Sequence, residues 1–187
     1  MFASIFVVLF WGSMVSAFDF NYSASADPIS VETPAPTQSF KRPVRLYIPS
    51  ISIDAKVEEV GVAKNGTMAT PRTFQTVGWY KYGPVPGEIG SAVLDGHSDN
   101  GLGLKGVFKR LEELEDGHDI YIYDKEGRQI HFRVISVDTY EYTEVPTDQI
   151  FNESERALLR LITCDGRWVR EYKTYDTRII VTAELVR

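Results

Sequence analysis

Cys164 is the only cysteine in the 187-residue chain, and its position calls for a chemical explanation. It ends the strand-like run "ALLRLITC", and an Asp-Gly pair follows it directly. A single cysteine cannot form an internal disulfide, so the first hypothesis is a reactive thiol that acts as a nucleophile. Because a free thiol has a pKa of about 8.5, this role requires a base or a cation nearby.

His97 is the best candidate for that base among the three histidines of the chain. His131 falls on the polar face of the run "RQIHFRVIS", and His118 lies in an Asp-Gly turn. His97 instead follows "SAVLDG" and opens a glycine-rich loop, where a rigid strand end commonly presents a side chain to a cleft. Spacing alone leaves open the alternative of a buried, unreactive cysteine and an ordinary loop histidine.

Arg178 is the candidate for the cation. The runs "ALLRLITC" and "TRIIVTAELV" read as two strands joined by "DGRWVREYKTYD", and the simplest arrangement is an antiparallel hairpin. In that hairpin Arg178 lies beside Cys164, where a guanidinium can stabilise an oxyanion. Arg167 and Arg170 in the connecting loop remain alternatives, whereas Arg160 lies roughly 13 Å away along the strand.

The elements that must position these residues are mostly short strands. From Val44 onward, seven or eight β-like runs are separated by Gly, Pro and Asn turns, and helical signals are weak. This pattern favours a mainly β domain over residues 44–187, a closed or partly closed barrel with one or two short helices.

Two further segments precede this domain. Residues 1–20 form a hydrophobic segment that is typical of a membrane anchor or a secretory signal, and Val15-Ser16-Ala17 fits a cleavage site. Residues 21–43 are rich in Pro, Ser and Ala and are typical of an extended linker. We therefore expect an exported chain, attached to the cell membrane if the segment is retained.

Charge and composition exclude some partners. The net charge of −6 and a pI near 5.1 argue against a nucleic-acid partner. The acidic run of Glu112, Glu113, Glu115 and Asp116 does not match an EF-hand loop, and a solvated acidic face is the preferred interpretation. We predict no metal site and no cofactor.

Several motifs together resemble the sortase family of cysteine transpeptidases. "LITCDG" is similar to the family's nucleophile motif, "LDGHSD" to its Gly-His segment, and "YDTRIIVTAEL" to the closing strand that begins with its arginine. The stretches "VRLYIPSISIDAKVEEVGV", "VGWYKYGPVPGEIGSAVLDGH" and "GVFKRLEELEDGHDIYIY" continue the likeness in the family's order, and the second resembles its class D, E and F group. Two departures are Gly117-His118-Asp119, where relatives often have Gly-Asp, and the lack of basic residues before the hydrophobic segment.

The resemblance implies an eight-stranded β-barrel with Cys164, His97 and Arg178 around a groove. It implies that Cys164 cleaves a Leu-Pro-x-Thr-Gly-like sorting signal through a thioester, that His97 transfers protons, and that Arg178 stabilises the tetrahedral intermediates. Thr163 and Trp168 are the predicted substrate-binding neighbours.

The partners implied by the resemblance are surface proteins with a C-terminal sorting signal, and an amine acceptor such as a cell-wall precursor or a pilin lysine. The catalytic domain is then extracellular at the cell membrane. Two alternatives remain from the sequence: an exported cysteine peptidase with water as acceptor, and a non-catalytic surface-binding β-barrel.

Overall fold

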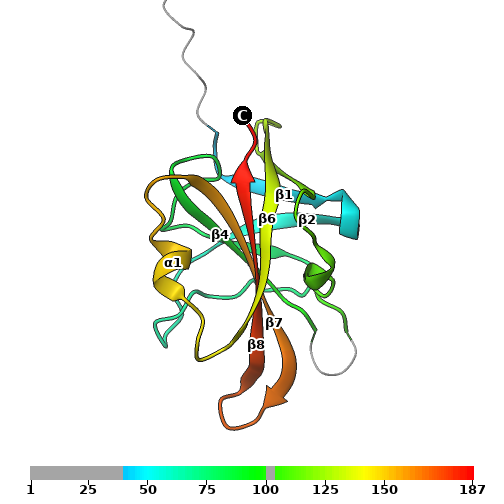
Figure 1. Cartoon of the computed structure of the whole chain (residues 1–187), viewed down its shortest axis with the longest axis vertical. Helices are drawn as coiled ribbons and strands as arrows, with labels where there is room; N and C mark the ends of the chain where they lie inside the picture. The colour runs from blue at the N-terminus through cyan, green and yellow to red at the C-terminus, as the bar shows by residue number, and fades with distance from the viewer. Residues whose placement is uncertain (1–39, 100–103) are drawn as a thin grey trace, which may run out of the picture. The chain divides into compact units, whose positions relative to one another are not determined.

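The computed structural model describes residues 40–99 and 104–187 (Figure 1). The predicted hydrophobic segment 1–20 and nearly all of the predicted linker 21–43 lie outside this part of the chain. Within it, no helix is both long enough and apolar enough to cross a membrane. The elements are, in order, β1 Pro43–Ile48, η1 Pro49–Ile51, β2 Ile53–Val60, β3 Val77–Tyr80, β4 Gly90–Gly96, η2 Leu111–Glu113, β5 Asp119–Asp124, β6 Gln129–Glu141, α1 Thr147–Phe151, β7 Ala157–Val169 and β8 Thr174–Leu185.

The eight strands form a closed barrel in the order β1-β2-β3-β4-β7-β8-β6-β5. The pairs β2–β3 and β4–β7 are parallel, and the other neighbours are antiparallel. Figure 1 shows the long strands β6, β7 and β8 side by side, with the β7–β8 hairpin extending at the lower end. The mainly β class and the closed eight-stranded barrel predicted from the sequence are confirmed.

The alternation of side chains along each strand explains which residues form the core. On β7, Leu159, Leu161 and Thr163 are buried, whereas Arg160 and Cys164 between and after them are only partly so. Because successive side chains of a strand point to opposite faces, the buried set faces the barrel interior and the other set faces outward. The outward-facing cysteine is therefore on the outside of the barrel.

A second, smaller apolar cluster covers the outer side of the same strands. Its buried members are Val93 on β4, Ile180 on β8 and Ile150 on α1. The short helix α1 thus packs against the outer face of the sheet, and Ile162 on β7 joins the cluster two residues before Cys164.

The β7–β8 connection differs from the sequence prediction. β7 runs on to Val169, and β8 already begins at Thr174, so that most of the expected loop is strand. The extension is possible because Gly166 adopts φ +83°, a left-handed conformation that favours glycine, at an irregularity between Asp165 and Trp168. Trp168 therefore lies on a strand, paired with Tyr175, and not in a loop.

Candidate active site

Three adjacent strands bring His97, Cys164 and Arg178 to one level of the barrel. In the parallel β4–β7 pair the last partners are Asp95 and Ile162, so that two residues further on His97 lies level with Cys164. In the antiparallel β7–β8 pair Cys164 is the direct partner of Arg178. Residues at one level of neighbouring strands share a face, with strands about 4.8 Å apart. The expected pairing of Cys164 with Arg178 is present, and His97 joins it from the other side.

Thr163 supports this register from the interior. Its buried hydroxyl donates a 2.7 Å hydrogen bond to the carbonyl oxygen of Gly96, one residue before His97. The bond fastens the end of β4 to β7 immediately below the level of Cys164. Because the hydroxyl is engaged internally, a substrate contact of Thr163, which stays a prediction, would have to come from its backbone.

The Cys164 thiol is partly buried and lies among opposing charges. Burial raises its pKa, and Asp95 and Asp165 add to this effect because their negative charges disfavour a thiolate. The Arg178 guanidinium and a hydrogen bond from Thr174 act in the other direction, but the pKa stays above its ordinary value. The resting thiol is therefore mostly protonated at neutral pH.

His97 is held by the loops around it. Its Nε2 lies 3.1 Å from the carbonyl oxygen of Pro71, and its ring centroid lies 4.6 Å from that of Phe74. A carbonyl oxygen only accepts, so Nε2 carries a proton in this arrangement. Gly106 passes so close that a Cβ there would lie 2.1 Å from the His97 carbonyl oxygen, which requires glycine at this position.

The Arg178 guanidinium is fixed by residues of its own strand. Its Nη1 donates to the carbonyl oxygens of Tyr175 at 3.0 Å and Thr177 at 2.8 Å. Its Nη2 donates to the Thr174 hydroxyl at 2.6 Å, and the group lies 5.8 Å from the Tyr142 ring centroid. Such a guanidinium is already oriented when negative charge develops beside Cys164.

Asp95 is a member of the site that the sequence identified only as a flanking residue. It lies on β4 two residues before His97, which directly follows the strand, so the alternation of side chains places both on the outer face. Burial raises the pKa of its carboxyl to about 6, although the charges of His97 and Arg178 lower it. The spacing of the "DGH" triplet could have indicated this, because residues two apart in a strand share a face.

A hydrogen-bonded link across the site could not be predicted from the sequence. The Tyr175 hydroxyl on β8 donates to Asp99, which lies in the loop that follows β4. Lys109 Nζ lies 3.0 Å from the other carboxylate oxygen of Asp99. The acceptor Asp99 raises the pKa of Tyr175 to about 12, so this phenol stays protonated and keeps donating.

Trp168 is more than half exposed, at 55%, and its ring meets that of Tyr175 edge to face at 5.4 Å. It therefore stands on the outer part of the β7–β8 hairpin, beyond the level of Cys164. Its contact with substrate stays a prediction.

The other two histidines have structural surroundings. His131 on β6 lies 2.7 Å from Asp119 and stacks on Tyr121 at 4.8 Å. His118 Nδ1 accepts a hydrogen bond from the backbone of Glu115. On β6 it is Tyr140, nine residues beyond His131, that pairs with Arg178, so His131 lies far from the level of Cys164 along the strand.

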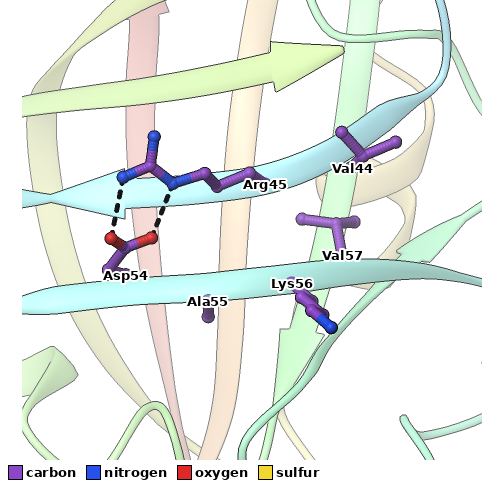
Figure 2. Close-up of a pocket in the computed structure, with 6 residues that line it drawn as sticks. All are labelled: Val44, Arg45, Asp54, Ala55, Lys56 and Val57. Atoms are coloured by element: carbon purple, nitrogen blue, oxygen red, sulfur yellow. Dashed lines mark hydrogen bonds and ion pairs between the residues drawn. The ribbon is translucent and has the colours of Figure 1, made fainter. Parts of the chain in front are cut away.

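An open surface depression of about 740 Å³ lies elsewhere on the barrel (Figure 2). It is lined by residues of β1 and β2, and Figure 2 shows Arg45 bonded to Asp54 through two nitrogens, at 2.6 and 2.7 Å. In the closed strand order β1 is four strands away from β7 in either direction. This depression is therefore separate from the Cys164 site.

In residues 40–99 and 104–187 no group of three or more His, Cys, Asp and Glu side chains lies close enough to hold a metal ion. Among the acidic residues around η2, Glu113 forms an ion pair with Arg110 at 2.5 Å.

Comparison with known proteins gives a single family. A model described as the sortase domain matches residues 46–186. The crystal structure of sortase C-1 from Actinomyces oris superposes with a TM-score of 0.59 and 27% identity, over 76% of this chain and 73% of that one. A search of curated proteins gave no match.

Two sortase A structures show the same fold at lower identity. Sortase A from Listeria monocytogenes has a TM-score of 0.59 and 20% identity, over 79% of this chain and 89% of that one. The lid mutant of sortase A from Corynebacterium diphtheriae has a TM-score of 0.59 and 21% identity, over 81% and 74%.

Proposed function

The chain belongs to the sortase family of cysteine transpeptidases, and on this premise we propose that it processes a Leu-Pro-x-Thr-Gly-like sorting signal through a Cys164 thioester. The observation that carries the proposal is the outward-facing row of His97, directly after β4, Cys164 on β7 and Arg178 on β8. The acyl group then passes to an amine at the cell surface.

In the first half-reaction, the Cys164 sulfur forms a bond to the carbonyl carbon before the scissile bond. The thiol proton passes to His97 as the sulfur attacks, the carbon–nitrogen bond breaks, and His97 gives this proton to the leaving amine. The negative oxygen of the tetrahedral intermediate is stabilised by the preorganised guanidinium of Arg178.

In the second half-reaction, an incoming amine attacks the thioester carbon and loses a proton to His97. The carbon–sulfur bond breaks, and the sulfur leaves as a thiolate next to Arg178. The acceptors we propose are a cell-wall precursor amine or a pilin lysine, and water competes slowly for the same thioester.

The apolar cluster beside the row supports an extended peptide as substrate. Four of its partly buried members lie on different elements: Tyr80 on β3, Tyr140 on β6, Phe151 on α1 and Ile162 on β7. Apolar side chains on the face that carries the nucleophile suit the apolar part of such a signal.

We also propose that residues 1–20 attach the protein to the cell membrane and that residues 44–187 act outside it, on surface proteins. The support is the uncharged hydrophobic character of the first eighteen residues, followed by a linker-like composition.

The test uses the chain with a panel of sorting-signal peptides, with and without an added amine. We expect mass spectrometry to find the acyl group on Cys164 and an amine-dependent transfer product. Cys164→Ala should form no acyl-enzyme, and His97→Ala and Arg178→Ala should each lose at least about 100-fold in kcat/KM.

His131→Ala is the matched control, because this histidine pairs with Asp119 on another part of the barrel and should leave transfer unchanged. Normal turnover by Cys164→Ala would rule the mechanism out. Cleavage at the same rate with and without amine, giving only hydrolysis, would identify a peptidase.

A further inference from the structure

The Thr174 side chain connects two members of the catalytic row. Thr174 opens β8, where its backbone pairs with Val169, five residues beyond Cys164. Its hydroxyl nevertheless lies 2.6 Å from Nη2 of Arg178, and its proximity to the Cys164 sulfur lowers the pKa of the thiol. The first residue of β8 thus reaches back to the level of the nucleophile.

The chemistry of the three groups determines which one donates and which one accepts in each contact. A guanidinium has only donors, so the Thr174 oxygen must accept from Arg178. The hydroxyl hydrogen remains free, and a thiolate has only acceptor capacity, so the hydroxyl donates to the sulfur once the sulfur is charged. A hydroxyl that accepts from a cation is a stronger donor, so the two bonds reinforce each other.

The charged groups around the sulfur make this extra donor useful. Asp95 from β4 and Asp165 from β7 disfavour a thiolate, and Arg178 from β8 favours it. The charge of a Cys164 thiolate raises the pKa of Tyr175, whose hydroxyl is hydrogen-bonded to Asp99. His97, which follows β4, and Tyr142, whose ring centroid lies 5.8 Å from the Arg178 guanidinium, are further titratable groups near the row.

The other bonds of Arg178 do not replace the one to Thr174. The carbonyl oxygens of Tyr175 and Thr177 hold Nη1 alone, whereas Thr174 holds Nη2. Without the hydroxyl the guanidinium can turn about its Nη1 contacts, and the negative charge of Asp95 attracts it.

We propose that Thr174 is a positioning residue of the transpeptidation site: its hydroxyl fixes the Arg178 guanidinium beside Cys164 and donates a hydrogen bond to the charged sulfur. This inference rests on the proposed function and deepens it. The thiolate is the attacking group in the first half-reaction and the leaving group in the second, so the hydroxyl assists both.

The experiment compares Thr174→Val, which removes the hydroxyl and keeps the shape, with Thr174→Ser, which keeps the hydroxyl. The rate of iodoacetamide alkylation is followed against pH, and it reports Cys164 alone because the chain has no other cysteine. We expect the midpoint of Thr174→Val to rise by about one pH unit, as for a lost hydrogen bond to a charged group. The midpoint of Thr174→Ser should stay at that of the unmodified protein.

Transfer between a sorting-signal peptide and an amine gives the second readout. Thr174→Val should lower kcat about tenfold with little change in KM, because the lost bonds act on the charged sulfur and the oxyanion. Thr174→Ser should restore most of the rate. Thr139→Val is the matched control, since this exposed threonine lies on the neighbouring strand β6 and should change neither readout.

An unchanged alkylation midpoint in Thr174→Val would overturn the inference, and so would a Thr174→Ser protein as impaired as Thr174→Val. Thr174→Ala also lacks the hydroxyl and replaces Thr174→Val if the latter unfolds. Alkylation needs no peptide, so a failure of the proposed function, seen as no transfer by any protein, is distinct from a failure here.

Discussion

At the scale of single residues, the site holds its nucleophile in the protonated form. Burial and the neighbouring carboxyl of Asp95 outweigh the favourable charge of Arg178, and the pKa of the thiol is raised. The attacking thiolate must therefore form together with substrate binding or proton transfer to His97. This arrangement protects the partly buried thiol from oxidation, because oxidants react with the thiolate and not with the protonated thiol.

Asp95→Asn tests this balance through the thiol. Removing the negative charge should lower the pKa of Cys164, so iodoacetamide should react at lower pH than in the unmodified protein. This shift is opposite in sign to the one expected for Thr174→Val, so the two variants distinguish charge from hydrogen bonding. Asp138→Asn, on β6, which is separated from β7 by β8, is the control and should leave the alkylation profile unchanged.

Asp95→Asn should also change the stability of the fold in a way that depends on pH. The pKa of Asp95 is raised from 3.8 to about 6, so the folded protein binds the proton more tightly, and its stability falls as pH rises through this window. Near neutral pH, Asp95→Asn should therefore raise the free energy of unfolding, by about 1–3 kcal/mol. Urea unfolding at several pH values should show the gap closing below the ordinary pKa, and a constant gap would contradict the assignment.

At the scale of elements, the site depends on how the β7–β8 hairpin meets the loop after β4. The hairpin extends beyond the barrel, and its Tyr175 hydroxyl is bonded to Asp99 in that loop, which Lys109 also contacts. The Tyr175–Asp99 hydrogen bond thus joins β8 to the loop that begins at His97. Strand β7, which carries Cys164, lies between these two segments and connects them through the sheet.

Tyr175→Phe removes the donor of this link and keeps the ring. We expect faster amide hydrogen exchange in the hairpin and in residues 104–110, and a loss of about 1 kcal/mol in the free energy of unfolding. Hydrogen exchange with mass spectrometry measures both segments. Tyr172→Phe, with an exposed ring in the turn of the same hairpin, should leave exchange unaltered; equal effects of the two changes would count against the link.

At the scale of the whole barrel, closure brings the first strand against the fifth. Asp124 ends β5, is almost fully buried, and accepts hydrogen bonds from the backbone of Lys41 at 3.1 Å and from Arg128 Nε at 2.7 Å. Burial by itself raises the pKa of this carboxyl, but the hydrogen bonds and the positive charge outweigh it and lower the pKa to about 2. One ionised side chain thus fastens the seam between β1 and the β5–β6 turn.

Asp124→Asn should lower the melting temperature at neutral pH, since the amide cannot accept all of these bonds. The pKa of Asp124 is depressed, so its contribution is present above the ordinary value of 3.8 and is lost as pH falls toward about 2. The difference in melting temperature between variant and unmodified protein should accordingly shrink over this range. Asp116→Asn, at an exposed position, serves as the control, and a difference that persists at the acid end would refute this account.

The sequence by itself predicted the mainly β class and the pairing of Cys164, the proposed nucleophile, with Arg178 on the next strand. Cys164 and Arg178 could be paired in advance because they lie on an antiparallel hairpin, whose register follows from a short connection and from alternation along two neighbouring runs. The likeness of the motifs to one family added the closed barrel, which is confirmed, and the role of His97, which stays a prediction.

Only the tertiary structure decided that His97 lies level with Cys164, because β4 and β7 are parallel strands with two other strands, β5 and β6, between them in the chain. No turn sets the register of such a pair, and it follows from packing of the whole barrel, with Thr163 bonded to Gly96 at the seam. The contacts of Thr174 and Tyr175 could not be predicted from the sequence for a related reason. Gly166 lets the hairpin continue past the expected loop. This extension depends on cross-strand contacts, such as that of Trp168 with Tyr175, which local sequence patterns do not encode.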